Sequence, residues 1–197
     1  MGDMDGLDVT ACTNCPALVE SRSRIVNGTG PADADVLFVG EGPGEQEDRD
    51  GEPFVGRSGT ILDDTLREKG LARADVRITN CVRCRPPENR DPTGEELENC
   101  RGYLEAEIEL IDPDVVVALG KVPSEHLLER DVAVTSEAGT IERATLGGAD
   151  RDVLICVHPA ATLYDRSQEE TLDAALEKAA AMAGDGGAGG QSQLGDF

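Results

Sequence analysis

The stretch that decides the fold is residues 36–63, which read VLFVGEGPGEQEDRDGEPFVGRSGTILD. Its first four residues are apolar and predict a buried strand, which ends at residues 40–44 because glycines permit a sharp change of backbone direction. An acidic loop, residues 45–50, follows, and the apolar spacing after Ser58 predicts a helix. In an open α/β sheet, ligands bind at the loops after the carboxyl ends of the strands, so this loop is the first candidate site.

The glycine loop does not match a dinucleotide-binding fingerprint. Residues 40–44 lack the G-x-G-x-x-G spacing, and Pro43 removes a backbone N–H that a phosphate cradle uses. A structural strand-to-helix turn is the plainer alternative. Glu41 between two glycines, and Phe54 in a chain that is 3% aromatic, favour a functional site.

The rest of the chain alternates predicted strands and helices. The pattern predicts strands at residues 76–82, 115–119 and 153–157 and helices at residues 93–110, 123–130 and 169–182. Short polar and apolar alternations in residues 132–148 predict a hairpin-like excursion. We therefore expect an α/β fold, a three-layer α/β/α sandwich with a four-stranded parallel sheet, because strands that alternate with helices pair in parallel through right-handed crossovers.

Polar side chains mark three of the predicted strand ends. Glu41 follows the first strand, Asn80 lies near the end of the second, and His158 follows the fourth. Because the carboxyl ends of parallel strands share one edge of a sheet, we expect these three loops to converge on one pocket.

The length and charge of the chain set further bounds. With 197 residues, it is long enough for one domain at residues 1–183 and a flexible glycine-rich tail at residues 184–197. Its net charge of −22 and its shortage of lysines and aromatics are typical of a halophile. High salt screens charge over a few ångströms, so the acidity does not exclude a DNA substrate. One local group is basic: Arg83, Arg85, Arg90 and Arg101.

No targeting or membrane segment is evident. The chain has no apolar run near eighteen residues, and its N-terminus lacks a basic region followed by an apolar segment. We therefore expect a cytoplasmic, monomeric protein.

Six cysteines in such a chain favour metal or cluster binding over disulfides. Two C-x-x-C pairs, Cys12/Cys15 and Cys81/Cys84, have the spacing of a four-cysteine zinc site, but Cys81 lies inside a predicted strand. An alternative set takes one residue from the strand end and one from the following helix: Cys12, Cys15, Cys84 and Cys100. That set suits zinc or an iron–sulfur cluster, and spacing does not separate the two. We expect Cys81 and Cys156 to be buried apolar residues.

Three long motifs together identify a family. They are GEGPGEQEDRDGEPFVGRSG at residues 40–59, ITNCVRCRPPENRDPTGEEL at residues 78–97 and VHPAATL at residues 157–163. In this order they resemble the iron–sulfur family 4 uracil-DNA glycosylases. The resemblance implies the uracil-DNA glycosylase fold, a uracil-containing DNA substrate whose base is flipped out, and hydrolysis of the bond between uracil and deoxyribose. It also implies a [4Fe-4S] cluster on the alternative cysteine set.

The resemblance also implies roles for single residues. Phe54 matches the aromatic residue that stacks on the flipped uracil. Asn80 matches the residue that reads the uracil edge, because an amide offers both an acceptor and donors, and cytosine presents the opposite pattern. His158 matches the histidine that donates to the uracil oxygen as that oxygen gains negative charge.

The remaining positions of these motifs are less determined. Glu41, the Gly42 backbone and Glu47 belong to the first motif, and either carboxylate could orient water or stabilise the sugar cation. The sequence does not decide between them. Leu163 falls where the family has an apolar side chain that fills the space of the flipped base. Ala160 replaces the serine that usually follows the proline, which puts a hydroxyl contact to phosphate in doubt.

The end of the chain carries a short motif. Gln191, Leu194 and Phe197 resemble the box that docks on the sliding clamp PCNA, and a tail without a partner is the alternative.

For the whole protein, the alternative function is a non-catalytic iron–sulfur DNA-binding or repair-scaffold protein. A zinc base deaminase is disfavoured, because the sequence has no H-x-E with a downstream P-C-x-x-C.

Overall fold

The structure, a computed structural model, describes residues 3–183. The predicted tail at residues 184–197 lies outside the described residues, together with Gln191, Leu194 and Phe197. The division into a domain and a tail therefore stays a prediction. Within residues 3–183, no helix is both long and apolar enough to cross a membrane.

The centre of the fold is a five-stranded sheet in the order β4-β3-β5-β7-β6. Its strands are β3 (Val36–Gly40), β4 (Arg77–Asn80), β5 (Val115–Leu119), β6 (Ile141–Leu146) and β7 (Ala149–Cys156). Four of them, β4, β3, β5 and β7, pair in parallel, as predicted. Strand β6 adds a fifth, antiparallel strand at the edge.

The extra strand comes from the predicted excursion. Gly147 and Gly148 both have positive φ, 58° and 77°, which a two-residue hairpin turn requires, and they return the chain from β6 to β7. The side chains of β6 are mostly half-exposed, as suits an edge strand. The strand count therefore exceeds the prediction by one, and the fold class is unchanged.

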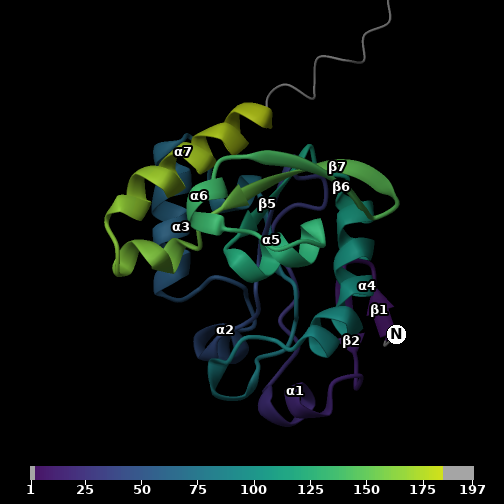
Figure 1. The fold of residues 1–197 in the computed structure, drawn as a ribbon. Helices are drawn as coiled ribbons and strands as arrows, with labels where there is room; N and C mark the ends of the chain where they lie inside the picture. The colour runs from purple at the N-terminus through teal and green to yellow at the C-terminus, as the bar shows by residue number, and fades with distance from the viewer. Residues whose placement is uncertain (1–2, 184–197) are drawn as a thin grey trace, which may run out of the picture.

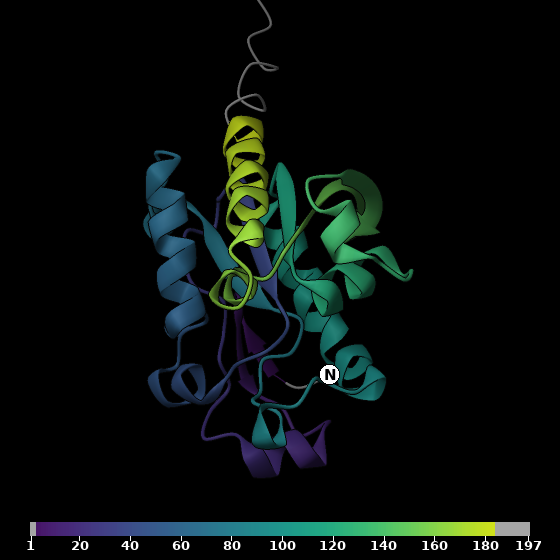
Figure 2. The same cartoon turned by 60° about the vertical axis from the view of Figure 1, so that its left-hand side comes forward.

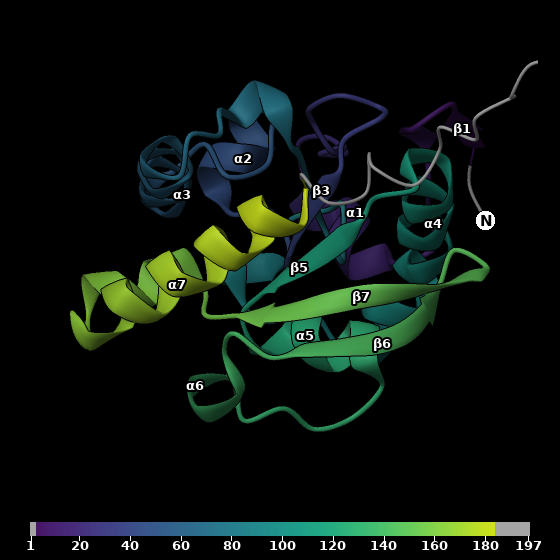
Figure 3. The ribbon, with the colours of Figure 1, turned by 90° about the horizontal axis from the view of Figure 1, so that it is seen from above.

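Helices cover both faces of the sheet (Figures 1 and 3). One face packs against α3 (Arg57–Glu68) and α7 (Ser167–Met182), and the other against α4 (Gly94–Ile111) and α5 (Lys121–Leu128). Strand β3 is buried throughout, so its successive side chains enter opposite cores: Phe38 faces α3 and α7, and Leu37 faces α4. The three-layer α/β/α sandwich is confirmed.

Short elements connect this framework. A hairpin of β1 (Asp3–Asp5) and β2 (Asp8–Ala11) precedes α1 (Pro16–Ser21), and α6 (Val134–Glu137) precedes β6. Single 3-10 turns are η1 (Arg73–Asp75), η2 (Pro87–Asn89) and η3 (Pro159–Leu163). The prediction of a loop at residues 45–50 is wrong, since this segment is helix α2 (Glu45–Asp50), which ends at Gly51 with φ 89°.

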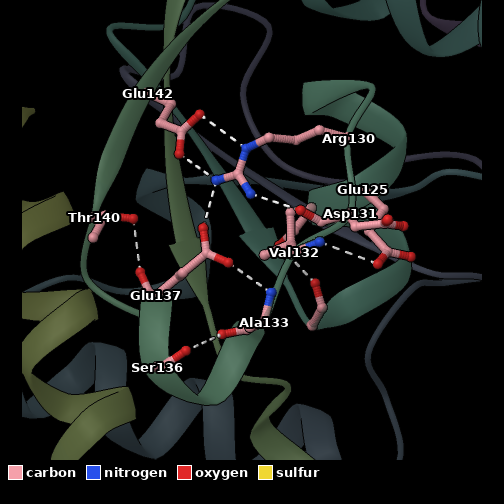
Figure 4. Close-up of polar contacts among 11 residues, drawn as sticks. Glu125, Arg130, Asp131, Val132, Ala133, Ser136, Glu137, Thr140 and Glu142 are labelled. Atoms are coloured by element: carbon pink, nitrogen blue, oxygen red, sulfur yellow. Dashed lines mark hydrogen bonds and ion pairs between the residues drawn. The ribbon is translucent and has the colours of Figure 1, made fainter.

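Arg130 fixes the excursion before β6 (Figure 4). Its Nη2 donates to Glu137 Oε2 at 2.5 Å, and its Nε donates to Glu142 Oε2 at 3.2 Å. Glu137 in turn accepts the backbone N–H of Ala133 at 2.6 Å. One guanidinium thus ties α6 to β6.

The predicted basic group at residues 83–101 is not a basic surface. Arg83 is 2% exposed and donates to Glu107 at 2.6 Å, and Arg77 donates to the other oxygen of Glu107 at 2.8 Å. The other three arginines of the group also pair with acids: Arg85 with Glu45, Arg90 with Glu96, and Arg101 with Glu105 and Glu129. Local neutralisation by acids that the sequence pattern did not pair with them explains this error.

Candidate active site

A pocket of about 200 Å³ opens at the carboxyl edge of the sheet. Its lining comes from the segments after β3 and β7 and from the end of β4: Glu41, Gly42, Gly44, Glu47, Phe54, Ser58, Asn80 and His158. Six of the seven predicted catalytic and substrate-binding residues are in this set, and Leu163 is not. The three polar strand ends therefore meet in one pocket, and the individual roles of the residues stay predictions.

The side chains of Phe54 and Asn80 both pack against the Cα of Gly40. A Cβ at Gly40 would lie 2.4 Å from Asn80 Oδ1 and 2.5 Å from Phe54 Cε2, both shorter than real Cβ contacts. Asn80 is 4% exposed, and the structure shows no hydrogen bond from its amide to any residue among 3–183. Glycine at this strand end lets a ring and an uncommitted amide stand side by side.

The backbone of Phe54 is held in an unusual conformation. Its φ is 54°, a left-handed value that costs a bulky residue free energy unless its surroundings enforce it. Arg73 donates from Nη1 to Phe54 O at 3.1 Å and from Nη2 to Pro53 O, and Arg73 also pairs with Asp63 at 3.1 Å. Gly59 leaves room for the same carbonyl, since a Cβ there would lie 1.7 Å from Phe54 O. Arg73 thus positions the ring, and no sequence pattern marks it.

Glu47 serves as an anchor for two helix starts. Its Oε1 accepts the backbone N–H groups of Val55 at 3.2 Å and Gly56 at 3.0 Å, and its Oε2 accepts that of Gly44 at 3.1 Å. Gly44 and Gly56 are the N-cap residues of α2 and α3. A carboxylate is favourable at helix N-termini, so Glu47 joins the two helices that border the pocket.

Glu41 is in a different situation. Burial, together with the charge of Asp91 and a hydrogen bond to it, raises the pKa of Glu41 to about 7. A hydrogen bond between two carboxyl groups requires a proton on one of them, which favours the protonated form of Glu41. Asp91 lies beside Pro92, which approaches Gly42 across the pocket rim. Asp91 is absent from the predicted set, because the sequence does not show that it faces Glu41.

His158 is arranged as a neutral hydrogen-bond donor. It caps η3, where its Nδ1 accepts the backbone N–H of Ala160 at 3.2 Å, so the ring proton belongs on Nε2. Burial lowers the pKa of His158, and the negative charge of Glu47 opposes that shift only in part. The imidazole ring lies 5.7 Å from the ring of Phe54, centroid to centroid.

Two exposed apolar side chains come shortly after His158 in the sequence. Leu163, at the end of η3, is 39% exposed, and Tyr164 is 90% exposed. Leu163 does not line the pocket, although it follows His158 by only five residues. The sequence analysis did not single out Tyr164.

A second, smaller cavity gathers the predicted cysteine set. It is lined by Leu18, Val19, Arg22 and Asn99 and by four thiols, those of Cys12, Cys15, Cys84 and Cys100. Arg22 donates to Cys84 Sγ at 2.8 Å and to Cys12 O at 2.7 Å. By contrast, Cys81 and Cys156 are fully buried in the two apolar cores.

The four thiols of this cavity could supply soft ligands to a metal group. Within residues 3–183, no three His, Cys, Asp or Glu side chains are grouped closely enough to hold one metal ion. A [4Fe-4S] cluster binds one thiolate at each iron, so its ligands stand farther apart than four thiolates on one zinc. Burial raises the pKa of Cys100 to about 12 and also raises the pKa of Cys84, which Arg22 opposes. Soft sulfur donors around one apolar cavity match that cluster.

Comparison with known proteins agrees with this site. The family model for the "Uracil DNA glycosylase superfamily" matches residues 27–180. A Type-4 uracil-DNA glycosylase of Thermotoga maritima is 46% identical over 162 residues, which cover 82% of each chain. One of Archaeoglobus fulgidus is 38% identical over 181 residues, 90% of each chain. A Type-5 uracil-DNA glycosylase of Thermus thermophilus is 36% identical over 151 residues, 61% of this chain and 68% of the relative.

The superfamily match covers the whole central sheet and all residues of the pocket. The Type-4 relatives extend the similarity over most of the length of the chain. The chain belongs to the uracil-DNA glycosylase superfamily and, within it, to the Type-4 uracil-DNA glycosylases.

Proposed function

We propose that this chain hydrolyses the bond between uracil and deoxyribose in DNA and so begins base excision repair. The observation that carries this proposal is the meeting of Phe54, Asn80 and His158 in one pocket above Gly40. A stacking ring, an uncommitted amide and a neutral donor are what recognition of a single flipped base requires.

Recognition of uracil begins with the flipped base in the pocket. The ring of Phe54 stacks on it, which contributes about 1–3 kcal/mol. Asn80 then pairs with the uracil N–H and the adjacent carbonyl, an arrangement that cytosine does not match. Because Asn80 is buried, cytosine would leave polar groups unpaired there, and this cost supplies the discrimination.

Bond cleavage leaves negative charge on uracil. As the bond from the sugar carbon to the uracil nitrogen breaks, its electron pair passes into the uracil ring. His158 donates from Nε2 to the uracil oxygen that takes up this charge. A donor placed in this way lowers the barrier by about 3–4 kcal/mol, because it is strongest once the charge has formed.

Glu41 is the carboxylate that we assign to the water. Both side-chain oxygens of Glu47 already accept backbone N–H groups, whereas among residues 3–183 the structure gives no backbone N–H that donates to the side-chain carboxylate of Glu41. Water adds to the sugar carbon, and Glu41 takes the proton that the water loses. Gly42 lies next to Glu41 in the lining. Leu163, which is exposed and outside the lining, would fill the gap left in the duplex.

The cofactor that we propose is a [4Fe-4S] cluster on Cys12, Cys15, Cys84 and Cys100. The cluster would link the N-terminal segment to the chain after β4, and its role is structural. It also accounts for four thiols around one cavity in a reducing environment.

Further expectations about the protein's setting stay proposals. The acidic composition, with 40 acidic and 18 basic residues, suits a monomer at work in the cytoplasm of a halophile. The motif of Gln191, Leu194 and Phe197 would bring the enzyme to the clamp PCNA. Calorimetry with the clamp and a chain lacking residues 185–197 tests the motif, and unchanged binding would end that idea.

The test of the function is uracil release from DNA. The cluster-loaded protein is incubated with duplexes that carry one uracil or, as the control, one thymine, over a range of KCl concentrations, and abasic sites are cleaved with alkali. We expect strand cleavage only with uracil. An intact strand at every salt concentration would favour the non-catalytic scaffold, which the comparisons do not favour.

A further inference from the structure

Most cations of this acidic chain are neutralised by its own carboxylates, as Arg130 is in Figure 4. Two further cations are occupied in other ways, since Arg22 donates to Cys84 and Lys178 to a backbone carbonyl. Within residues 3–183, the exposed arginines with no carboxylate at ion-pair distance are Arg24, Arg57 and Arg166. In a protein with a net charge of −22, cations left without a partner are the exception.

These three arginines belong to the segments that surround the pocket. Arg57 is the first residue of α3 and precedes Ser58, which lines the pocket. Arg166 is the N-cap of α7 and follows η3, which begins after His158. In Figures 1 and 2, α3 and α7 both start at the lower ends of their helices, the ends nearer to α2, and α1 lies lower still.

Arg24 lies beside α2. It lines a shallow pocket of about 280 Å³ with Arg85 and with the acids Glu45 and Asp48. Asp48 accepts the backbone N–H of Ser23 at 2.8 Å, so its charge is already engaged. Glu45 lies 3.8 Å from Arg85, which leaves the guanidinium of Arg24 without a carboxylate partner.

The positions of Arg57 and Arg166 do not stabilise the fold. A cation in the first turn of a helix is disfavoured by the helix dipole, by about 0.3–1 kcal/mol at an exposed site. Neither arginine gains an ion pair in return. Their charge is therefore available to an anion outside the protein.

We propose that Arg24, Arg57 and Arg166 bind backbone phosphates of the DNA strand on both sides of the flipped nucleotide. The proposal rests on the function proposed above. Guanidinium groups bind phosphate with two parallel hydrogen bonds, and such contacts fix the register of DNA without reading its sequence. The pocket then reads the base, and the three arginines hold the strand across its mouth.

The test is the salt dependence of DNA binding. Fluorescence anisotropy measures the affinity for a labelled duplex without uracil over a range of KCl concentrations, for R24Q, R57Q, R166Q and the triple variant. Each phosphate contact contributes about 0.9 to the slope of log K against log salt, so each single variant should lose about 0.9 and the triple about 2.7. The lysine variant R57K, which keeps the charge, should keep the slope.

Matched controls are R67Q and R143Q. Both arginines are exposed, and each pairs with a neighbouring acid, Asp64 and Asp152 respectively. The proposal is overturned if the controls lose as much slope as the three variants, or if the three variants lose none. Melting temperatures equal to that of the wild type show that the variants fold.

The two proposals fail in different ways. If the arginine variants lose slope as expected but the wild-type protein releases no uracil, the glycosylase assignment ends and the phosphate assignment stands. If the wild-type protein releases uracil normally but all three variants keep the wild-type slope, the phosphate assignment ends and the glycosylase assignment stands. For an active enzyme, we also expect the triple variant to raise KM at least tenfold with kcat unchanged at saturating DNA.

Discussion

The uracil pocket and the cysteine cavity adjoin the same strand, β4, but different interactions hold them. In the pocket, backbone contacts and a half-buried guanidinium fix the lining: Arg73 holds the backbone of Phe54, and Glu47 ties two helix starts together. In the cavity, the thiols come from segments far apart in sequence, and the side chains of Arg22 and Asn99 donate to two of them, Cys84 and Cys15. The contacts within the fold therefore account for the arrangement of the pocket, whereas the proposed cluster would have to hold the four thiols of the cavity together.

The largest effect should come from the pocket's hydrogen-bond donor. Replacing His158 with alanine removes the Nε2 proton from the developing uracil anion, so we expect kcat to fall by about 10²–10³-fold. The melting temperature should change little, because the only hydrogen bond that the structure gives this side chain is to Ala160. Single-turnover kinetics and calorimetry measure the two quantities.

The matched control is the second histidine of the chain, His126 in α5. H126A removes an imidazole that does not line the pocket, so it should leave kcat within about twofold of the wild type. Equal losses in the two variants would mean that H158A acts through the fold and not through the anion.

The cysteine cavity should respond in the opposite way. Replacing Cys84 with serine should abolish bound iron and lower the free energy of unfolding by several kcal/mol, because binding of a structural metal is folding energy. Iron content and the visible absorbance that bleaches on reduction are the measurements. C156A, which changes a cysteine in the apolar core, should keep its iron. Full iron in C84S would remove Cys84 from the ligand set.

Variants of the two pocket carboxylates, Glu41 and Glu47, should have different effects: one on the reaction rate and the other on stability. Because the pKa of Glu41 is raised to about 7, its carboxylate forms as the pH rises through 7, and the rate should rise with it. In E41Q, this dependence on pH should vanish together with most of the rate. E47Q should keep the dependence and lose about 1–3 kcal/mol of stability, because an amide N–H₂ then faces a backbone N–H.

Stability and pH give an independent check on Glu41. Between pH 4.5 and about 7, the folded state keeps a proton on Glu41 that the unfolded state releases, so the free energy of unfolding falls as the pH rises through this window. E41Q should remove that part of the slope. An unchanged slope in E41Q, together with a lost one in E47Q, would exchange the two assignments.

The same contrast explains what the sequence could predict. Three of the parallel strands were predicted from continuous apolar runs and β4 from alternating apolar and polar residues, and the pocket was predicted because polar residues end three of the strands. Helix α2 was missed because its six residues are polar and tertiary contacts of Glu47 stabilise it. Arg73 and Asp91 act on Phe54 and Glu41 across the fold, and such a pairing leaves no pattern in a single sequence. Our proposal of Glu41 over Glu47 rests on where backbone N–H groups point, which a single sequence does not show.

The smallest expected effect concerns Leu163, which the pocket leaves outside. If its side chain fills the space of the flipped base, L163A should lower kcat/KM severalfold on duplex DNA and leave it unchanged on single strands, where no stack has to be held open. Leu110 is the matched control, since it is 58% exposed on α4 and Leu163 is 39% exposed. L110A should leave both substrates unaffected. An equal loss on duplex and single strands in L163A would place Leu163 in the support of His158, and the pocket would then extend beyond its present lining.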